Sequence, residues 1–254
     1  MDELIRTFNY NSEGGGGMTG MLASVTSVNE AGIVLRAGVD IIDIKDPVQG
    51  ALGALSTQST QEIVGHIAGR TLTSATIGDL PSVPGLISEA ITKTAGTGVD
   101  IVKVGLFDDY LDQPLLDVFR EKSGLGMEIV IVLFADKNPD FAAIKKLAET
   151  GIKGVMLDTA IKKNGTLRTI LKDSVLRCFV DQARAEGLMT GLAGSLALDD
   201  IDPLLLLDPD YIGFRGALCR EHQRIEAIDE MSVHRVRNRI PVAGITATKA
   251  SAFL

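Results

Sequence analysis

A carboxylate and an ammonium group stand close together inside an apolar stretch early in this sequence. Residues 40–47 read DIIDIKDP and have the apolar content of a buried strand, yet they contain Asp43 and Lys45. Alternate residues of a strand share a face, so these two side chains point the same way, opposite to Ile42 and Ile44. Two charges on one buried face are costly unless they pair or that face opens onto a site. The pattern indicates an active site, with a structural ion pair near a strand end as the alternative.

The pattern recurs in later strand-like segments, where an apolar run again carries a charged residue. These residues are Lys103 in IVKVG, Asp158 in VMLDT and Arg215 in GFRGA, and Lys162 follows Asp158 by four residues. Lys103 lies between two valines, so it faces the barrel interior if the valines face helices. Lysine is almost never fully buried without a partner or a purpose. The recurrence favours catalysis over a structural ion network.

Such a cluster supports Schiff-base chemistry. A lysine that is desolvated and crowded by another ammonium has a depressed pKa, and its neutral amine can attack a carbonyl. The resulting iminium acidifies the neighbouring carbon, and a second lysine or a carboxylate can then move protons. Metal ligation by Asp43 and Asp158 is the weaker interpretation, because the lysines would compete for the oxygens and no His lies on these strand ends. We therefore expect neither a metal nor another cofactor.

The elements that must position these residues alternate regularly. Strand-like segments span 21–28, 40–47, 71–78, 100–107, 128–135, 152–160, 188–195 and 211–219. A helix-like segment follows each of them, and Asn29 is the expected N-cap of the first helix. This rhythm, with no composition break between the halves, predicts one α/β domain, a (β/α)8 TIM barrel over 21–240. A doubly wound sheet is disfavoured, because no strand is followed by a GxGxxG or GxxxxGK[ST] motif.

In such a barrel the active face lies at the C-terminal ends of the strands, and alternate strands share a layer of side chains. The charged residues fall on the second, fourth, sixth and eighth strand candidates, so we expect them to converge. Ser74 and Thr76 lie on one face of the third strand, where they either hydrogen-bond substrate or fill the barrel. Asp79 follows that strand and either caps the next element or reaches the mouth.

Glycine-rich ends of the last two strands suggest a phosphate site. The loops after these strands often hold a phosphate through backbone N–H groups. The segments are LAGS, 192–195, and GFRGA, 213–217, and the predicted contacts are Gly194, Ser195, Arg215 and Gly216. The alternative for Arg215 is that its side chain points inward and pairs with a carboxylate of the protein and not with a phosphate. In the alternative interpretation, the glycines only allow tight turns and bind no ligand.

Composition excludes several classes of partner. The formal net charge is -8 and the sequence pI is about 5.0, which argues against a nucleic-acid or anionic-membrane surface. Trp is absent and aromatic residues make up 4%, so a platform for stacking bases is not expected. No apolar run approaches the length of a membrane span. A phosphorylated small molecule fits better, because a local cationic pocket can form on an acidic protein.

The remaining features set the expected boundaries and location. Residues 1–20 contain a GGGG run and no apolar signal segment, so they are interpreted as a leader or flexible extension, and 241–254 as a C-terminal tail. Cys178 and Cys219 are expected to be buried thiols in a reducing cytoplasm. His66, His222 and His234 are expected at the surface, without a catalytic role. A homo-oligomer is compatible with the sequence, although no feature fixes the oligomeric state.

Six motifs in chain order resemble one family. They are DIIDIKDP, SATIGD, VKVGL, MLDTAIK, LAGSL and GFRGALC. The set resembles the (5-formylfuran-3-yl)methyl phosphate synthase family, which makes the furan precursor of methanofuran-type one-carbon carriers, and it covers nearly the whole chain after the leader. The resemblance implies a barrel enzyme that condenses two molecules of glyceraldehyde 3-phosphate with loss of phosphate and water. It further implies that Lys45 is the Schiff-base lysine and Lys103 the proton acceptor, assisted by Asp43, Asp158 and Lys162.

Three regions depart from the family pattern, namely the leader, the tail after Ile240 and a charged loop after Cys219. These departures bear on the entrance to the substrate site and on oligomer assembly more than on the reaction chemistry. Two other functions remain open at this point. One is a class I aldolase that uses the same lysine on phosphosugars, and the other is a non-catalytic barrel that binds a phosphorylated metabolite.

Overall fold

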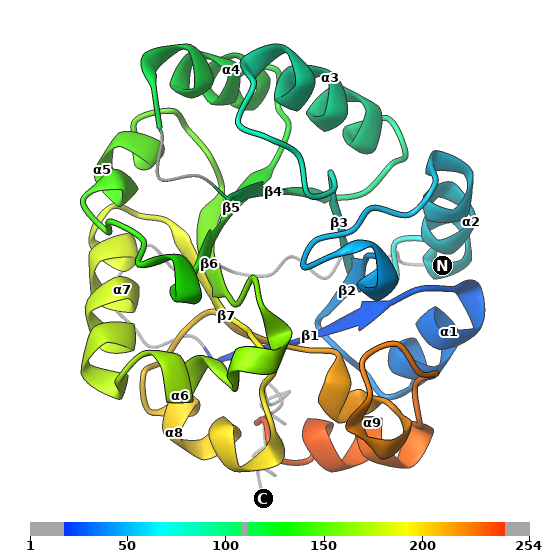
Figure 1. Cartoon of the computed structure of the whole chain (residues 1–254). Coiled ribbons are helices and arrows are strands. Elements are labelled where there is room, and N and C mark those ends of the chain that lie inside the picture. Colours follow the sequence, from blue (N-terminus) through cyan, green and yellow to red (C-terminus); the bar gives the residue numbers. More distant parts are fainter. Residues whose placement is uncertain (1–17, 108–110, 242–254) are drawn as a thin grey trace, which may run out of the picture.

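Eight apolar segments pair in parallel, each with its neighbour in the chain, and the last pairs with the first. The computed structural model describes residues 18–107 and 111–241, and within these ranges the strands close into a barrel surrounded by helices (Figure 1). The strands are β1 Gly20–Val25, β2 Ile41–Ile44, β3 Leu72–Thr76, β4 Ile101–Leu106, β5 Ile129–Phe134, β6 Gly154–Asp158, β7 Met189–Leu192 and β8 Tyr211–Phe214. The predicted (β/α)8 barrel is confirmed.

The helices form the outer layer in Figure 1. Their bounds are α1 Val28–Arg36, α2 Thr57–Ile67, α3 Pro84–Ala95, α4 Gln113–Gly124, α5 Ala143–Ala148, α6 Leu167–Ile170, α7 Asp173–Ala185, α8 Ile201–Leu205 and α9 Glu230–Arg237. The expected N-cap of the first helix was wrong: Ser27, not Asn29, caps α1, and its hydroxyl accepts a hydrogen bond from the amide of Glu30. The Glu30 carboxylate in return accepts from the Thr26 amide at 2.8 Å, which fixes the helix start at this position.

Two apolar cores lie on the two sides of the strands. The larger fills the space between the barrel and the helices and includes Ile42 and Ile44. The smaller lies inside the barrel and includes Leu22, Ile41 and Met156. Strand alternation therefore sends Ile42 and Ile44 of β2 outward and leaves Ile41 and Asp43 facing the interior, as the period of two predicts.

All eight strands end before their predicted last residues, and in β2 and β8 this places a charged residue beyond the end of the strand. β2 ends at Ile44, so Lys45 is the first residue of the following loop. Pro47 lacks an N–H, and the Asp46 carboxylate accepts from the Val48 amide at 2.9 Å, which turns the chain away from the sheet. β8 ends at Phe214, so Arg215 also stands just past its strand.

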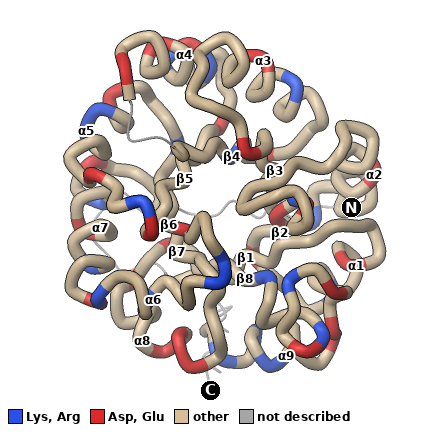
Figure 2. Tube along the Cα trace, viewed as in Figure 1, with Lys and Arg blue, Asp and Glu red and all other residues tan. Residues whose placement is uncertain are grey.

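Charges of both signs are distributed along the outer helices in the view of Figure 2. In the part of the chain that the structure describes, no helix is long and apolar enough to cross a membrane. Residues 1–17 and 242–254, which make up most of the leader and tail, lie outside the described residues. Cys219 is buried, but Cys178 is exposed, contrary to expectation. The buried stripe of α7 runs through Leu176, Phe179 and Val180, which turns Cys178 toward solvent.

Candidate active site

Asp43 is the centre of a buried ion-pair cluster inside the barrel. Its side chain is fully buried, Lys103 Nζ lies 2.7 Å from one carboxylate oxygen, and Lys45 Nζ lies 3.8 Å from the other. The hydroxyls of Ser24 and Ser74 donate to the same carboxylate at 2.9 and 2.7 Å. Ser74, predicted to contact substrate or to fill the barrel, thus supports Asp43. Both carboxylate oxygens are satisfied, so the cluster can hold its charges away from water.

Strand register explains why these residues meet. Ser24 of β1 stands beside Asp43 of β2, and Asp43 stands beside Ser74 of β3. Lys103 of β4 lies level with Thr76, two residues further along β3. Because residues i and i+2 share a face, all of these side chains enter the barrel near the same height.

A second ion pair lies at the end of β6. The amine of Lys162, four residues after Asp158, donates to the Asp158 carboxylate, which also accepts from the Thr159 amide at 2.7 Å. The Asp136 carboxylate holds the start of this loop by accepting from the amides of Ala160 and Ile161, each at 2.7 Å. Lys162 therefore folds back over the strand end, as its spacing from Asp158 suggested.

Asp79 performs the corresponding task for the loop after β2. Its carboxylate accepts from the amides of Ala51 and Leu52 at 3.0 and 2.8 Å. Of the two roles that the sequence left open for Asp79, the structure shows the second, because the residue lines the mouth. Its hydrogen bonds to the loop after Lys45 are a further role that the sequence did not suggest.

The charged groups of the two ion pairs change the pKa of Lys45. Burial, together with the nearby ammonium groups of Lys103 and Lys162, lowers the pKa of Lys45 to about 8, and the opposing charges of Asp158 and Asp43 limit the decrease. Burial alone would raise the pKa of Asp43, but the charges of Lys103 and Lys45, with hydrogen bonds from Lys103 and Ser74, hold it below its usual range. The amine of Lys45 is thus easily deprotonated beside an ionised carboxylate.

Asp158 is held ionised in the same way. Burial would raise its pKa, but the charges of Lys162 and Lys45, with hydrogen bonds from Lys162 and from the Thr159 amide, keep the pKa below its usual range. The carboxylate can therefore accept a proton only while a reaction changes the charges around it.

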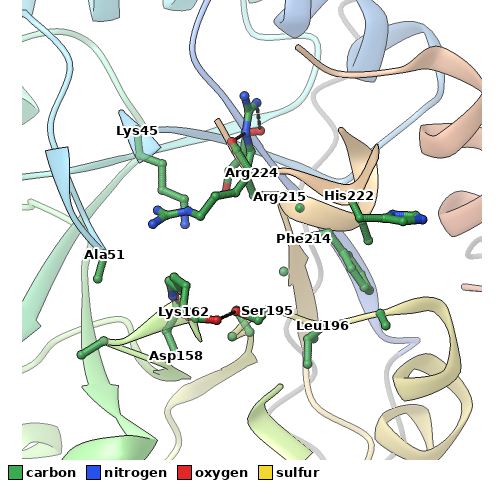
Figure 3. Close-up of a pocket in the computed structure, with 18 of the residues that line it drawn as sticks. Lys45, Ala51, Asp158, Lys162, Ser195, Leu196, Phe214, Arg215, His222 and Arg224 are labelled. Carbon is green, nitrogen blue, oxygen red and sulfur yellow. Dashed lines mark hydrogen bonds and ion pairs between the residues drawn. The ribbon is translucent and has the colours of Figure 1, made fainter. Parts of the chain in front are cut away.

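A cavity of about 1100 Å³ opens at the C-terminal ends of the strands, and Lys45, Asp158 and Lys162 line it (Figure 3). Asp43, Lys103 and Ser74 do not contribute to its lining. These residues lie beneath Lys45, inside the barrel. The site thus has a layer that can touch a ligand and a buried layer that acts on Lys45.

The glycine-rich loops after β7 and β8 also line the cavity. Gly194 has φ 119°, and a Cβ there would stand 2.8 Å from the Thr159 side chain, so the position requires glycine. Within the described residues, no hydrogen bond engages the amides of Gly194, Ser195, Leu196, Gly216 or Ala217. These N–H groups are available to an anion in the cavity.

Arg215 pairs with a carboxylate, which is the alternative role that the sequence left open. Its guanidinium forms a two-pronged ion pair with Glu30 at 2.6 and 3.2 Å, and it donates to the carbonyl oxygens of Ser24, Arg224 and Glu226. All five N–H donors are therefore used. A substrate phosphate has no donor left on this residue, so we no longer assign Arg215 a phosphate contact.

Comparison with known proteins identifies the family. The model of the family described as 4-HFC-P synthase matches residues 21–237. The chain belongs to the 4-HFC-P synthase family. The resemblance inferred from the six motifs is therefore confirmed, and the matched range contains every element of the 4-HFC-P synthase barrel seen here, except the first residue of β1.

Curated relatives of this family extend over most of the chain. The (5-formylfuran-3-yl)methyl phosphate synthase of Methanopyrus kandleri is 33% identical over 215 residues, which are 80% of this chain and 91% of that protein. The synthase of the same name from Methanococcus aeolicus is 34% identical over 217 residues, 81% of this chain and 92% of that protein. A relative from Methylorubrum extorquens, provisionally named for the same activity, is 42% identical over 209 residues, 82% of this chain and 86% of that protein. These names indicate a synthase enzyme.

Solved structures of other enzymes share the fold of this 4-HFC-P synthase family member. A 3-hexulose-6-phosphate synthase superposes with a TM-score of 0.65 at 15% identity, covering 88% of this chain and 100% of that chain. Phosphoribosyl anthranilate isomerase of Thermus thermophilus gives a TM-score of 0.63 at 12% identity, covering 87% of this chain and 98% of that chain. At such identities the likeness concerns the barrel architecture alone.

The sequence did not reveal two residues that line the cavity of this family member. Arg224 and His222 belong to the charged loop after Cys219, and both border the cavity. His222 was expected at the surface, and it is exposed even though it reaches the rim. The charge of this loop was visible in the sequence, but only the path of the chain after β8 shows which of its side chains turn inward.

Replacing Asp43 with Asn is expected to lower the free energy of unfolding by about 3–5 kcal/mol, because two buried ammonium groups lose their carboxylate. Urea unfolding followed by circular dichroism measures the change. Asp117→Asn is the matched control, since its carboxylate pairs with Arg120 at the surface, where both side chains are more than half exposed; a change under about 1 kcal/mol is expected there. Equal losses in the two variants would contradict a stabilising role for the buried cluster.

Proposed function

We propose that this protein condenses two molecules of glyceraldehyde 3-phosphate into (5-formylfuran-3-yl)methyl phosphate, with loss of phosphate and water. The names of the curated relatives support this product. The observation that carries the proposal is Lys45, an amine at the inner wall of the cavity whose pKa is lowered to about 8. Such an amine is suited to attack an aldehyde near neutral pH. The furan would serve the biosynthesis of methanofuran-type carriers, and the predicted cytoplasmic location is part of the same proposal.

In the first step, Lys45 attacks the aldehyde carbon of one triose phosphate, and loss of water gives an iminium. Asp43 tunes this amine, because its carboxylate lies 3.8 Å from Lys45 Nζ and stabilises the cation that forms. The second ammonium, Lys103, lies on the other oxygen of Asp43 and limits that stabilisation. Because these two effects oppose each other, the Lys45 amine can lose its proton before it attacks, and the positively charged iminium is still stabilised by Asp43 after it forms.

In the next step, a proton leaves the carbon beside the iminium, and the resulting enamine either eliminates phosphate or attacks the second aldehyde. We assign proton removal to Lys103, beneath Lys45 in the buried layer, with Asp43 between them. For this step its amine must be in the neutral form and must extend past Asp43 to the carbon held on Lys45. Asp158, which faces the cavity, is the other base within the site. Measurements on Lys103 variants distinguish the two.

Asp158 and Lys162 are assigned to proton transfer during the dehydrations. Their hydrogen bond joins a carboxylate and an ammonium that both face the cavity. Lys162 can give a proton to a departing hydroxyl, and Asp158 can receive one from carbon. Formation of the aromatic furan makes these late steps effectively irreversible.

Phosphate binding is assigned to the amides of the loops after β7 and β8. The free N–H groups of Gly194, Ser195 and Gly216 border the same cavity as Lys45. Backbone donors of this kind hold phosphate without adding a titrating group. The phosphate of one of the two trioses would thus lie across the mouth from Lys45.

Incubation with glyceraldehyde 3-phosphate tests the proposal. Furan-aldehyde absorbance should appear together with released phosphate. Reversible interconversion of trioses and a sugar phosphate without furan would instead indicate a class I aldolase. Substrate binding without any turnover would indicate a phosphometabolite-binding barrel, and either result would overturn the proposed function.

The initial rate of adduct formation at Lys45 is expected to rise with pH through about 8 and to level off above about pH 9. The pKa of this amine is lowered to about 8 in the fold, so its neutral, nucleophilic fraction grows over that range. Asp43 and Asp158 have lowered pKa values and stay ionised throughout. Borohydride trapping with glyceraldehyde 3-phosphate at a series of pH values measures the rate. A flat profile from about pH 6 to 9 would contradict the lowered pKa.

A further inference from the structure

Arg224 stands at the mouth of the cavity, in the segment between β8 and α9. It is half-buried, and its Nη2 donates to the carbonyl oxygen of Gly50 at 2.9 Å in the loop after β2. Figure 3 shows the side chain extending across the mouth toward Lys45. The hydrogen bond joins the loop after β8 to the loop after β2 and fixes the guanidinium on the Lys45 side of the cavity.

Most donors of this guanidinium are unused. An Arg side chain carries five N–H donors. Within the described residues, the bond to Gly50 is the only hydrogen bond that the Arg224 guanidinium makes, and no ion pair joins this guanidinium to a carboxylate. Asp158 and Asp79 act on its charge only from a distance, and Asp79 already accepts from two backbone amides. A half-buried cation with spare donors therefore faces the cavity without a protein anion to neutralise it.

A buried ion pair holds the backbone of Arg224 in place. Arg215 Nε donates to the Arg224 carbonyl oxygen at 2.8 Å, and Arg215 Nη2 donates to that of Glu226 at 2.9 Å. The partner of Arg215 is Glu30, whose second oxygen accepts from the Ile228 amide at 3.1 Å. Both ends of the loop are thus tied to α1 before any ligand binds, which reduces the ordering cost of binding.

We propose that Arg224 binds the phosphate group of the triose that reacts at Lys45, at a site separate from the amides after β7 and β8. The inference rests on the proposed function, because two phosphorylated trioses must then lie in one cavity and require two anion sites. A guanidinium fork matches two phosphate oxygens, which a lysine cannot do. The ligand class is the phosphate monoester of a three-carbon aldehyde, whose carbonyl carbon meets Lys45 while its phosphate meets Arg224.

Titration with glycerol 3-phosphate tests the site, since this probe has the phosphate but no carbonyl and cannot form an iminium. Wild-type protein is expected to bind it at both anion sites, and Arg224→Gln to weaken one of them about 10- to 100-fold. Arg220→Gln is the matched control: Arg220 lies on the same loop, is exposed and makes no side-chain hydrogen bond within the described residues. A change below about twofold is expected there. Calorimetry gives both affinities and the stoichiometry.

Arg224→Lys keeps the positive charge but loses the fork, so an intermediate loss of about 3- to 10-fold is expected. If Arg224→Gln does not fold, this conservative variant decides the question, because affinity equal to that of the wild type would overturn the inference. Equal binding by Arg224→Gln, or no binding of the probe by the wild type, would also overturn it. Furan formation by the wild type would leave the proposed function standing in those cases. Loss of probe binding in Arg224→Gln, with no furan from the wild type, would support the site and refute the function.

Discussion

Lys45→Ala is expected to lower furan formation from glyceraldehyde 3-phosphate by about 10³-fold or more. The amine is the nucleophile that converts the aldehyde into an iminium, and the other amines of the site are engaged elsewhere. Lys103 is held by Asp43 at 2.7 Å beneath the cavity, and Lys162 is hydrogen-bonded to Asp158. Neither can take the place of Lys45 without breaking a buried ion pair.

Lys93→Ala is the matched control for this substitution, because Lys93 lies exposed near the end of α3, outside the barrel. Its turnover should equal that of the wild type. Steady-state furan absorbance and phosphate release measure both variants, with circular dichroism to confirm folding. If Lys45→Ala kept turnover near that of the wild type, the Schiff-base assignment would be wrong.

Lys103→Met is expected to lower turnover by about 10²- to 10⁴-fold while the adduct on Lys45 still forms. Methionine keeps an apolar chain of similar length but cannot accept a proton, so the reaction should stop after iminium formation. Lys45 remains beside Asp43 at 3.8 Å, so the adduct still forms, but more slowly near neutral pH because one ammonium that lowers the pKa of Lys45 is gone. Borohydride trapping and furan absorbance on the same sample separate the two steps.

Lys122→Met provides a matched control for removing a largely buried lysine. Lys122 lies on α4, pairs with Glu121 at 3.0 Å and does not line the cavity. Its turnover should stay near that of the wild type. Near-normal turnover in Lys103→Met would remove Lys103 from the proton-transfer step and move that role to Asp158, the base that faces the cavity.

The arrangement of Asp43, Lys45 and Lys103 could be predicted from the sequence, because it depends on two simple rules. Side chains alternate along a strand, and parallel strands of a barrel bring their C-terminal ends to one face. The apolar neighbours of each charged residue fix which side it faces. The separation into a layer that lines the cavity and a layer beneath it could not be predicted, since the depth of a residue depends on the stagger of the strands.

Arg215 shows a different limit. The sequence places it at the active face, near the C-terminal end of β8, but its partner Glu30 is on α1, far away in the chain. Whether an Arg at this position reaches substrate or a carboxylate depends on the path of two loops, which no local pattern encodes. The same holds for Arg224, whose orientation depends on hydrogen bonds from Arg215 to the backbone of its loop.

The most direct test of the central claim is mass spectrometry of protein incubated with glyceraldehyde 3-phosphate and quenched with borohydride. Reduction converts an iminium into a stable secondary amine, so the modified lysine can be located after digestion. A triose-derived adduct on Lys45 is expected, together with furan product in the unquenched sample. An adduct on another lysine, or furan formed without any adduct, would contradict the central claim.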